Sequence, residues 1–528
     1  MGYGRAKRAI SVFSGALGAI LLTCTVASAT PVGSPPMLLP ESGAAASGSY
    51  WIVGARQSTR SNRIAGSFGA KRIAGLPAFT VTRGRANALA QRLATADLLT
   101  YAEPDIKVAR KSAMEGHLGS WARVAVVPAD LQWPAPGGVS VAVLDDRVDS
   151  SVADLRDQTT WLNTNPTTDP HGTMVASTIS AVVGDGGVVG VFPGTPILSF
   201  GLKSFSCAEI AKGIDSAVTA GARIINMSLG MTSACFSLYA AIQRAYSKNV
   251  LSVAAAGNEF AEGNPTEYPA AFPHVVSAAA TDSQGRVSDF SNANTAVDVS
   301  APGVNVPVDV PMRFDTEDGL QNGVTRVDGT SFSAPITAGA AAWIAAARPE
   351  LKVGQIADVL RRSAIDIKPT GYDRNSGFGR ISLPAALTEE TPAQDPLEPN
   401  DDASFLNGTA LGTPSPYLWK GEATLTLVAT IDQIKDPLDV YAVRIPARTK
   451  LRASTTPKFG NPDLAVYSAK AKTVTGSRYR LKRSRKGGKR VDRVVINNTA
   501  YKPLRVFLVV SDNDRSLLNS SYTLRVGP

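Results

Sequence analysis

The chain has 528 residues, too many for one ordinary domain, and its length predicts about three folded units. Hydrophobic residues make up 44% of it and charged residues 19%, a balance that excludes wholesale disorder. The net charge is +10, but residues 470–493 hold eleven Lys or Arg against one acid, Asp492, so the rest is near neutral. A polycation that binds nucleic acid over its whole surface is therefore excluded, and the basic run is more typical of a solvated loop than of a ligand site.

The first 29 residues are typical of an export signal. Basic residues precede an apolar stretch over 10–26, and Ala27-Ser28-Ala29 is a small-residue cleavage site. We expect cleavage after Ala29 and a secreted or cell-surface protein. A retained membrane anchor and lipid attachment at Cys24 are the alternatives, and no second segment is long and apolar enough to span a bilayer.

Cleavage there leaves two cysteines, Cys207 and Cys235. Two cysteines in an exported chain favour one disulfide bond over two free thiols. The sequence contains no CxxC-type metal pattern.

Residues 30–48 are rich in Pro, Gly, Ser and Ala and predict a flexible lead-in. Residues 49–110 then predict a small α+β unit, called the leading unit below. Its expected strands lie at 50–53, 78–81 and 101–106, and its expected helix at 86–99. A connector follows, up to residue 120.

Residues 121–387 predict an α/β domain. Nearly continuous apolar runs at 139–144, 223–227, 250–256 and 275–280 suit parallel strands that are covered on both faces. Helix-like spacing at 207–220 and 236–248 separates them, and Ser206 with Glu209 offers a capping box. Such alternation is typical of a parallel sheet flanked by helices.

Residues 388–400 form a linker rich in Pro and acidic residues, and residues 401–528 predict a C-terminal domain. Apolar residues alternate with period two at 424–428, 440–443 and 505–509, and turn residues separate these runs. This pattern indicates an antiparallel β-sandwich.

Four polar residues lie at strand ends or helix starts, the positions where α/β enzymes usually place catalytic groups. Asp145 ends an apolar strand, and Asn258 follows another, at the carboxyl ends where open α/β sheets place functional groups. His171 begins a helix of small residues. Ser331 must lie in the first turn of a helix, because Pro335 is tolerated only near a helix start. Of the other histidines, His117 lies in the connector, and His274, at a strand entrance, is expected to be structural.

These residues suit nucleophilic catalysis. A carboxylate can fix the tautomer of an imidazole, which then activates a serine hydroxyl. A helix N-terminus and an asparagine amide can both donate hydrogen bonds to a developing oxyanion.

The order Asp, His, Ser and five motifs resemble the subtilisin-like serine peptidases. The motifs are His171-Gly172-Thr173, Gly329-Thr330-Ser331 followed by Ser333-Ala334-Pro335, Ala255-Ala256-Gly257-Asn258, Ile225-Asn226-Met227-Ser228-Leu229-Gly230 and Gly377-Phe378-Gly379. The match covers about 270 residues, and the set is specific where a lone Gly-Thr-Ser would not be.

The resemblance implies a serine endopeptidase that hydrolyses peptide bonds through an acyl-enzyme. Its implied catalytic residues are Asp145, His171 and Ser331, its oxyanion donor is Asn258, and its substrate-binding residues are Ser228, Leu229, Gly230, Gly257 and Glu267. Residues 49–110 resemble the propeptide-inhibitor of this family, although a first helix is not evident. The tail resembles the bacterial pre-peptidase C-terminal domain. We expect a monomer that acts on protein or peptide substrates.

Two features leave alternatives open. Asp146 and Arg147 follow the catalytic Asp where the family usually has Thr or Ser and then Gly. Arg147 can neutralise Asp146, or the scaffold has lost activity and the protein is a catalytically silent secreted binding protein. A lipase or esterase is disfavoured because no Gly-x-Ser-x-Gly elbow precedes a suitable helix.

Many relatives bind calcium, but residues 182–190 offer only Asp185 as a charged ligand, so we expect no metal or other cofactor.

The resemblance also indicates a specificity. Glu267, before the Tyr-Pro pair, lies near the base of the pocket for the residue before the scissile bond, and Glu259 lies at its rim. Two carboxylates there favour Lys or Arg. The alternative is that both glutamates point into solvent.

Overall fold

The computed structural model describes residues 50–528 except 106–108, 111–113, 116–120, 129–130, 133, 183–187, 295, 317–318, 393, 433–434 and 513–518. Of residues 109–110 and 114–115 it describes the backbone. The predicted export signal, Cys24 and the 30–48 lead-in lie outside the described residues, as do most of the connector and Asp185.

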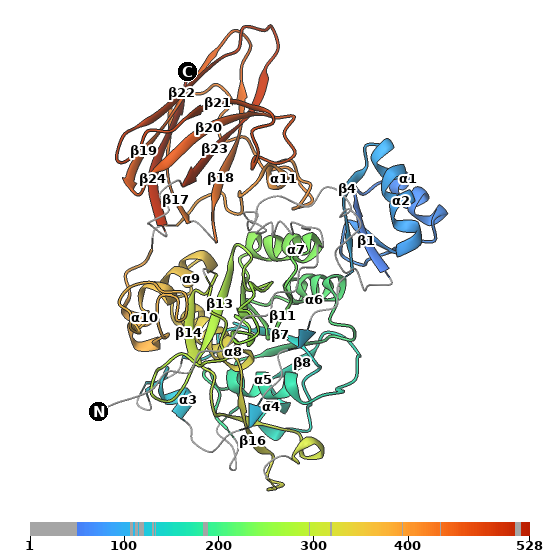
Figure 1. Cartoon of the computed structure of the whole chain (residues 1–528), viewed down its shortest axis with the longest axis vertical. Helices are drawn as coiled ribbons and strands as arrows, with labels where there is room; N and C mark the ends of the chain where they lie inside the picture. The colour runs from blue at the N-terminus through green and yellow to red at the C-terminus, as the bar shows by residue number, and fades with distance from the viewer. Residues whose placement is uncertain are drawn as a thin grey trace, which may run out of the picture.

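The leading unit is a four-stranded sheet with two helices (Figure 1). Its elements are β1 (Tyr50–Ala55), α1 (Thr59–Ser67), β2 (Lys71–Arg72), β3 (Ala78–Thr82), α2 (Arg83–Thr95) and β4 (Leu99–Pro104), and the sheet order is β2-β3-β1-β4. α1 is not evident from the sequence because its nine residues are mostly polar. It begins at a cap instead, where Ser58 Oγ accepts a hydrogen bond from Ser61 N–H at 2.9 Å.

A seven-stranded parallel sheet forms the centre of the α/β domain, which confirms the predicted fold class. In spatial order its strands are β14 (Val299–Pro302), β13 (Val275–Thr281), β12 (Leu251–Ala255), β10 (Ile224–Met227), β7 (Val141–Asp145), β9 (Ile197–Gly201) and β8 (Thr159–Trp161). The strands from β14 to β9 are fully buried. Continuous apolar runs predict this for β7, β10, β12 and β13, whereas β9 and β14 were not predicted.

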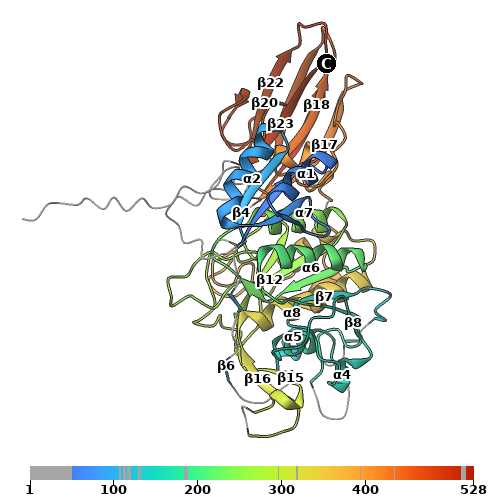
Figure 2. The same cartoon turned by 90° about the vertical axis from the view of Figure 1, so that its right-hand side faces the viewer.

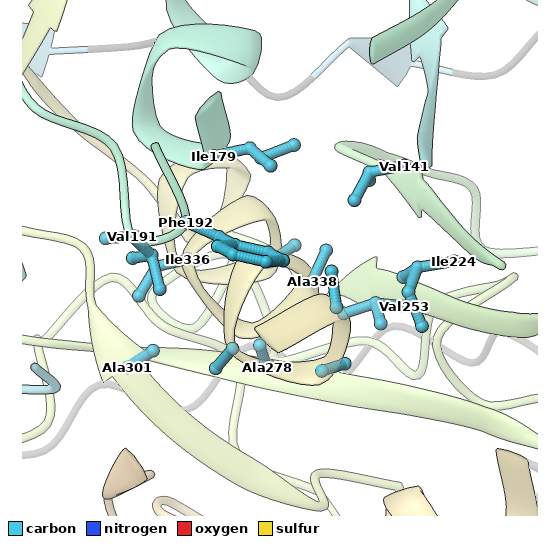
Figure 3. Packing of buried hydrophobic residues seen from close by; sticks show 14 of the residues in the cluster. Val141, Ile179, Val191, Phe192, Ile224, Val253, Ala278, Ala301, Ile336 and Ala338 are labelled. Carbon is cyan, nitrogen blue, oxygen red and sulfur yellow. The ribbon is translucent and has the colours of Figure 1, made fainter. Parts of the chain in front are cut away.

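Helices cover both faces of this sheet. Figure 2 shows α6 (Cys207–Thr219) and α7 (Phe236–Ser247) on one side and α5 (His171–Ser180) and α8 (Thr330–Ala347) on the other. Ile336 and Ala338 of α8 pack among Val253 and Ala278 of the sheet (Figure 3). Shorter helices surround this core: α3 (Trp121–Val124), α4 (Ala153–Arg156), η1 (Met312–Phe314), α9 (Val353–Arg362) and α10 (Leu383–Thr388).

The predicted capping box of α6 forms only in part. Ser206 Oγ accepts a hydrogen bond from Glu209 N–H at 3.3 Å. The Glu209 carboxylate, however, accepts from the N–H groups of Lys203 and Ser204, at 2.9 and 2.6 Å. In a complete capping box the Glu209 carboxylate would accept a hydrogen bond from the Ser206 N–H. Here it accepts from the two N–H groups of the preceding loop instead.

Two small antiparallel sheets attach the end of the leading unit and the connector to the α/β domain. β5 (Ala109–Arg110) pairs with β11 (Leu229–Gly230). β6 (Met114–Glu115) pairs with β16 (Val324–Asp328), which also pairs with β15 (Val306–Asp309). The backbone before the α/β domain thus pairs with two of that domain's strands, β11 and β16.

The C-terminal domain consists of two antiparallel four-stranded sheets, ordered β17-β24-β19-β22 and β18-β23-β20-β21, packed around a shared apolar core (Figure 1). The strands are β17 (Leu425–Asp432), β18 (Leu438–Ile445), β19 (Lys450–Phe459), β20 (Pro462–Ser468), β21 (Arg480–Ser484), β22 (Asp492–Asn497), β23 (Leu504–Asp512) and β24 (Asn519–Gly527), preceded by α11 (Ala403–Leu406). Within the residues described, no helix has the length and apolarity needed to cross a membrane.

Candidate active site

Asp145 and His171 meet at the carboxyl end of β7. His171 Nδ1 lies 2.9 Å from both carboxylate oxygens of Asp145, and the two side chains are 3% and 1% exposed. This contact makes Nδ1 the protonated nitrogen and Nε2 the basic one. A Cβ at residue 172 would meet the Asp146 carbonyl oxygen at 1.9 Å, so Gly172 is what lets α5 approach β7 this closely.

Ser331 is the second residue of α8, so the predicted helix start is correct, but Pro335 is the sixth residue and lies inside the helix rather than in its first turn. The ring of its neighbour Phe332 has its centroid 5.8 Å from that of His171, which places the start of α8 beside the imidazole. The Ser331 carbonyl accepts a hydrogen bond from Ser228 Oγ at 2.7 Å. The structure therefore places the start of α8, which carries Ser331, beside the Asp145–His171 pair.

Asn258 also adjoins the start of α8. Its Oδ1 accepts hydrogen bonds from Thr330 N–H and Thr330 Oγ1–H, at 2.9 and 2.8 Å. Because the oxygen is held in this way, the amide nitrogen is the end that remains to donate. Sequence reasoning singled out Asn258 but not Thr330, although Thr330 stands next to Ser331 in the same motif.

The predicted substrate strand lies against the same helix start. Ser228 immediately precedes β11, whose residues Leu229 and Gly230 pair with Arg110 and Ala109 of β5. Asn226 Nδ2 donates to Ser228 Oγ at 3.0 Å, and Ser228 in turn donates to Ser331. β11 thus already accepts an extended backbone of the kind that a peptide substrate presents.

The Asp146-Arg147 departure is accommodated in the loop after β7. Asp146 is buried and accepts a hydrogen bond from Thr168 Oγ1 at 2.8 Å. The Arg147 guanidinium lies over the ring of Trp161, 4.3 Å from its centroid. Both charged side chains are held without displacing Asp145 from His171.

A family model described as the subtilase family matches residues 137–379. Subtilisin DY from Bacillus licheniformis is 32% identical over 259 residues, which are 47% of this chain and 90% of that protein. The chain belongs to the subtilase family. A subtilisin from Bacillus pumilus is 34% identical to this subtilase over 260 residues, again 47% of the chain and 90% of the relative.

Among solved structures, fervidolysin from Fervidobacterium pennivorans resembles the subtilase with a TM-score of 0.62. The match covers 92% of this chain and 95% of that one, at 18% identity, and shows a shared fold. As a member of its family, the chain is a serine endopeptidase.

The leading unit caps two helices of the subtilase. The Glu103 carboxylate accepts hydrogen bonds from the N–H groups of Phe236 and Ser237 at the start of α7, the latter at 2.9 Å. Asp105 accepts from Ala208 N–H at the start of α6, at 3.4 Å. Negative charge at helix N-termini is stabilising, but burial dominates at Glu103 and raises its pKa to about 7. Sequence reasoning missed both contacts.

Cys207 and Cys235 form the predicted disulfide bond, with their Cα atoms 6.5 Å apart. Cys207 begins α6, and Cys235 is the N-cap of α7. The bond therefore joins the same two helix starts that the leading unit caps.

Two overlapping groups of side chains are able to hold a metal ion where the C-terminal domain meets the subtilase domain. One is His274 with Glu398 and Asp401, and the other is Asp395 with Glu398, Asp436 and Asp439, one ligand atom from each lying within 4.8 Å of the others. Both carboxylate oxygens of Asp401 are buried without a hydrogen-bond partner. Burial and mutual repulsion raise the pKa of each of these carboxyls. Oxygen-rich groups of this kind suit Ca²⁺, and the sequence-based search, confined to residues 182–190, did not consider them.

His274 packs at the junction between the subtilase domain and the C-terminal domain. Its ring stacks on Tyr246, with centroids 3.9 Å apart, and its Nδ1 lies 2.6 Å from Gln243 Oε1. Burial lowers the pKa of His274 to about 3, so the ring is neutral at the junction between the two domains.

Proposed function

We propose that this subtilase is an exported endopeptidase in which Asp145, His171 and Ser331 form the catalytic triad. The contact between His171 Nδ1 and the Asp145 carboxylate carries the proposal. It is short, buried and located beside the start of the helix that holds Ser331. A buried carboxylate alone does not distinguish a catalytic histidine, since His274 also lies 3.3 Å from the buried Glu398; the neighbouring start of α8 is what supports the catalytic role of His171.

In the proposed reaction, His171 Nε2 takes the proton of the Ser331 hydroxyl as Oγ attacks the scissile carbonyl carbon. The carbonyl oxygen becomes an oxyanion, which accepts hydrogen bonds from Asn258 Nδ2 and from the Ser331 N–H. His171 then protonates the leaving amine as the C–N bond breaks, and an acyl-enzyme remains. Water adds to the ester with His171 as base, and the acid product and the free serine are released.

We infer that the leading unit is the inhibitor of this active site. Its β5 strand lies on β11, where the backbone of a substrate is expected, and Glu103 and Asp105 hold the unit on two helix starts. Competition for β11 then keeps the enzyme inactive until the unit is removed. Protein and peptide substrates are expected to pair with Ser228, Leu229 and Gly230 in the same way.

Export is proposed from the basic, apolar and small-residue order of residues 1–29, and the disulfide fits an oxidising compartment. The same argument predicts that the mature enzyme acts outside the cell or at its surface.

Labelling with a fluorophosphonate probe tests the function directly, since the probe reacts only with an activated serine. We expect the purified mature protein to be labelled at Ser331 and the Ser331→Ala variant to remain unlabelled. Ser333→Ala is the matched control, because Ser333 lies on the same helix and its Oγ donates to the Ala301 carbonyl at 3.0 Å. A mature protein that folds but takes up no probe would instead be a catalytically silent binding protein.

A further inference from the structure

The basic run of residues 470–493 lies along two sheet edges of the C-terminal domain, and not in one solvated loop as its composition suggests. β21 is the last strand of one sheet, β22 is the last strand of the other, and the two strands are in contact. β21 pairs with β20, β22 pairs with β19, and residues 485–491 join them. Figure 1 shows both strands in the part of this domain that lies away from the subtilase domain. Much of the run is therefore held in place by strand pairing.

The acidic residues near the run serve the structure of the domain and leave most of its positive charge uncompensated. The buried Asp463 carboxylate pairs with Arg483 and Arg485, at 3.2 and 2.9 Å. Asp492 is buried and accepts a hydrogen bond from the Lys486 N–H at 3.0 Å. The run has eleven Lys and Arg residues. The nine other than Arg483 and Arg485 are exposed, and within the described part of the chain none of the nine is paired with an acid. These nine side chains are called the basic surface below.

Protection of the sheet edges explains only part of this charge. Lysine on an edge strand prevents edge-to-edge pairing with another molecule, and Lys482 of β21 is typical of that role. Lys486, Lys489 and Arg490, however, lie in the connection between β21 and β22, outside both strands. Like charges that stand so close repel one another, and an anionic partner relieves this repulsion.

Exposed apolar side chains lie among the cations. Tyr479 and Leu481 are 40% and 47% exposed and alternate along the chain with basic residues. Val495, on the outward side of β22, is 36% exposed. Such side chains gain little from a soluble anion, but they stabilise binding where headgroups meet hydrocarbon in a bilayer. Cations mixed with apolar groups are typical of a protein surface that lies on an anionic membrane.

We propose that the basic surface binds membranes rich in anionic lipids, with its cations on the lipid phosphates and Tyr479 and Leu481 at the bilayer interface. The proposal goes beyond the endopeptidase function and does not depend on it. Clusters of four to eight Lys or Arg are sufficient for such binding, and each cation near the surface strengthens it by about fivefold. Because Ser331 belongs to the other domain, the basic surface concentrates the enzyme at a lipid surface without using its catalytic groups.

The test is co-sedimentation of the protein with lipid vesicles. The Ser331→Ala chain is produced from residue 30 onward, so that neither autolysis nor the apolar residues 10–26 contribute. The vesicles contain phosphatidylcholine alone or equal parts of phosphatidylcholine and phosphatidylglycerol. Soluble polyphosphate serves as a second anionic probe, and its binding is measured by calorimetry.

Three variants of this chain are compared with it. In the first, Lys486, Lys489 and Arg490 are replaced by glutamine. In the matched control, three exposed lysines of the subtilase domain, Lys203, Lys212 and Lys248, are replaced by glutamine, so the loss of net charge is the same. The third is the double variant Tyr479→Ser/Leu481→Ser. All the replaced side chains are exposed, and thermal unfolding checks that each variant is folded.

At about 0.1 M salt we expect binding to the anionic vesicles, little binding to the neutral ones, and loss of binding near 1 M salt. The first variant should bind the anionic vesicles about 100-fold more weakly, and the control should stay within about fivefold of the parent chain. Equal binding to both kinds of vesicle overturns the proposal, as does an equal loss in the first variant and the control.

The Tyr479→Ser/Leu481→Ser variant separates a membrane from a soluble polyanion. It should bind anionic vesicles about tenfold more weakly and bind polyphosphate as tightly as the parent chain does, because only a bilayer takes up the apolar side chains. Vesicle binding that is unchanged in this variant would assign the basic surface to a soluble polyanion and overturn the proposal.

Discussion

Removal of the Cys207–Cys235 bond should destabilise the fold by an amount that follows from its place in the chain. The bond closes a loop of 28 residues, and in the chain-entropy model such a loop contributes about 3–4 kcal/mol. For a domain of this size, a change of that magnitude lowers the melting temperature by about 7–14 °C. The loop contains β10 and β11, so the reduced chain gains freedom around the substrate strand as well.

The assay is thermal unfolding of the Ser331→Ala chain, oxidised and reduced, followed by tryptophan fluorescence. The Ser331→Ala background prevents autolysis, and the reduced chain keeps both sulfur atoms, so packing is matched. The variant with both cysteines replaced by alanine should unfold near the reduced chain, or slightly below it because each buried sulfur leaves a small cavity. Melting temperatures of the oxidised and reduced chains within about 2 °C of each other would refute the loop-entropy reasoning.

Three further outcomes are expected. Asn258→Ala should lower kcat by about 10²–10³ with little change in KM; this range was established for an oxyanion donor of subtilisin and is carried over here. Thr330→Val should lower kcat by about tenfold because it removes one of the bonds that orient Asn258, while Thr330→Ser should retain activity. Burial raises the pKa of Glu103 to about 7, so its contribution to the stability of the uncleaved Ser331→Ala chain is complete below about pH 4.5 and is lost as the pH rises towards 7. Thermal unfolding from pH 5 to 8 should show this loss, and Glu103→Ala should flatten that part of the profile; an unchanged profile would contradict the assignment.

The sequence by itself determined the class of the fold and the order of its active-site motifs. Continuous apolar runs predict buried parallel strands, because a strand that is covered on both faces needs apolar residues at consecutive positions. The helix start near Ser331 was inferred from Pro335, and the start is found there, although Pro335 is the sixth residue of α8 and lies beyond the first turn to which the inference confined it. Two remaining cysteines left one intramolecular pairing.

The tertiary structure decided what depends on residues far apart in the chain. The bonds from Thr330 to Asn258 span 72 residues, and those from Ser237 to Glu103 span 134. No local pattern encodes such contacts, because they arise from the order of the strands in the sheet and from the docking of the leading unit. The burial of Glu267 was undecidable for the same reason. Residues 262 and 267 are both glutamates of the loop between Asn258 and Tyr268, and only the tertiary structure shows that Glu267 is buried while Glu262 is exposed.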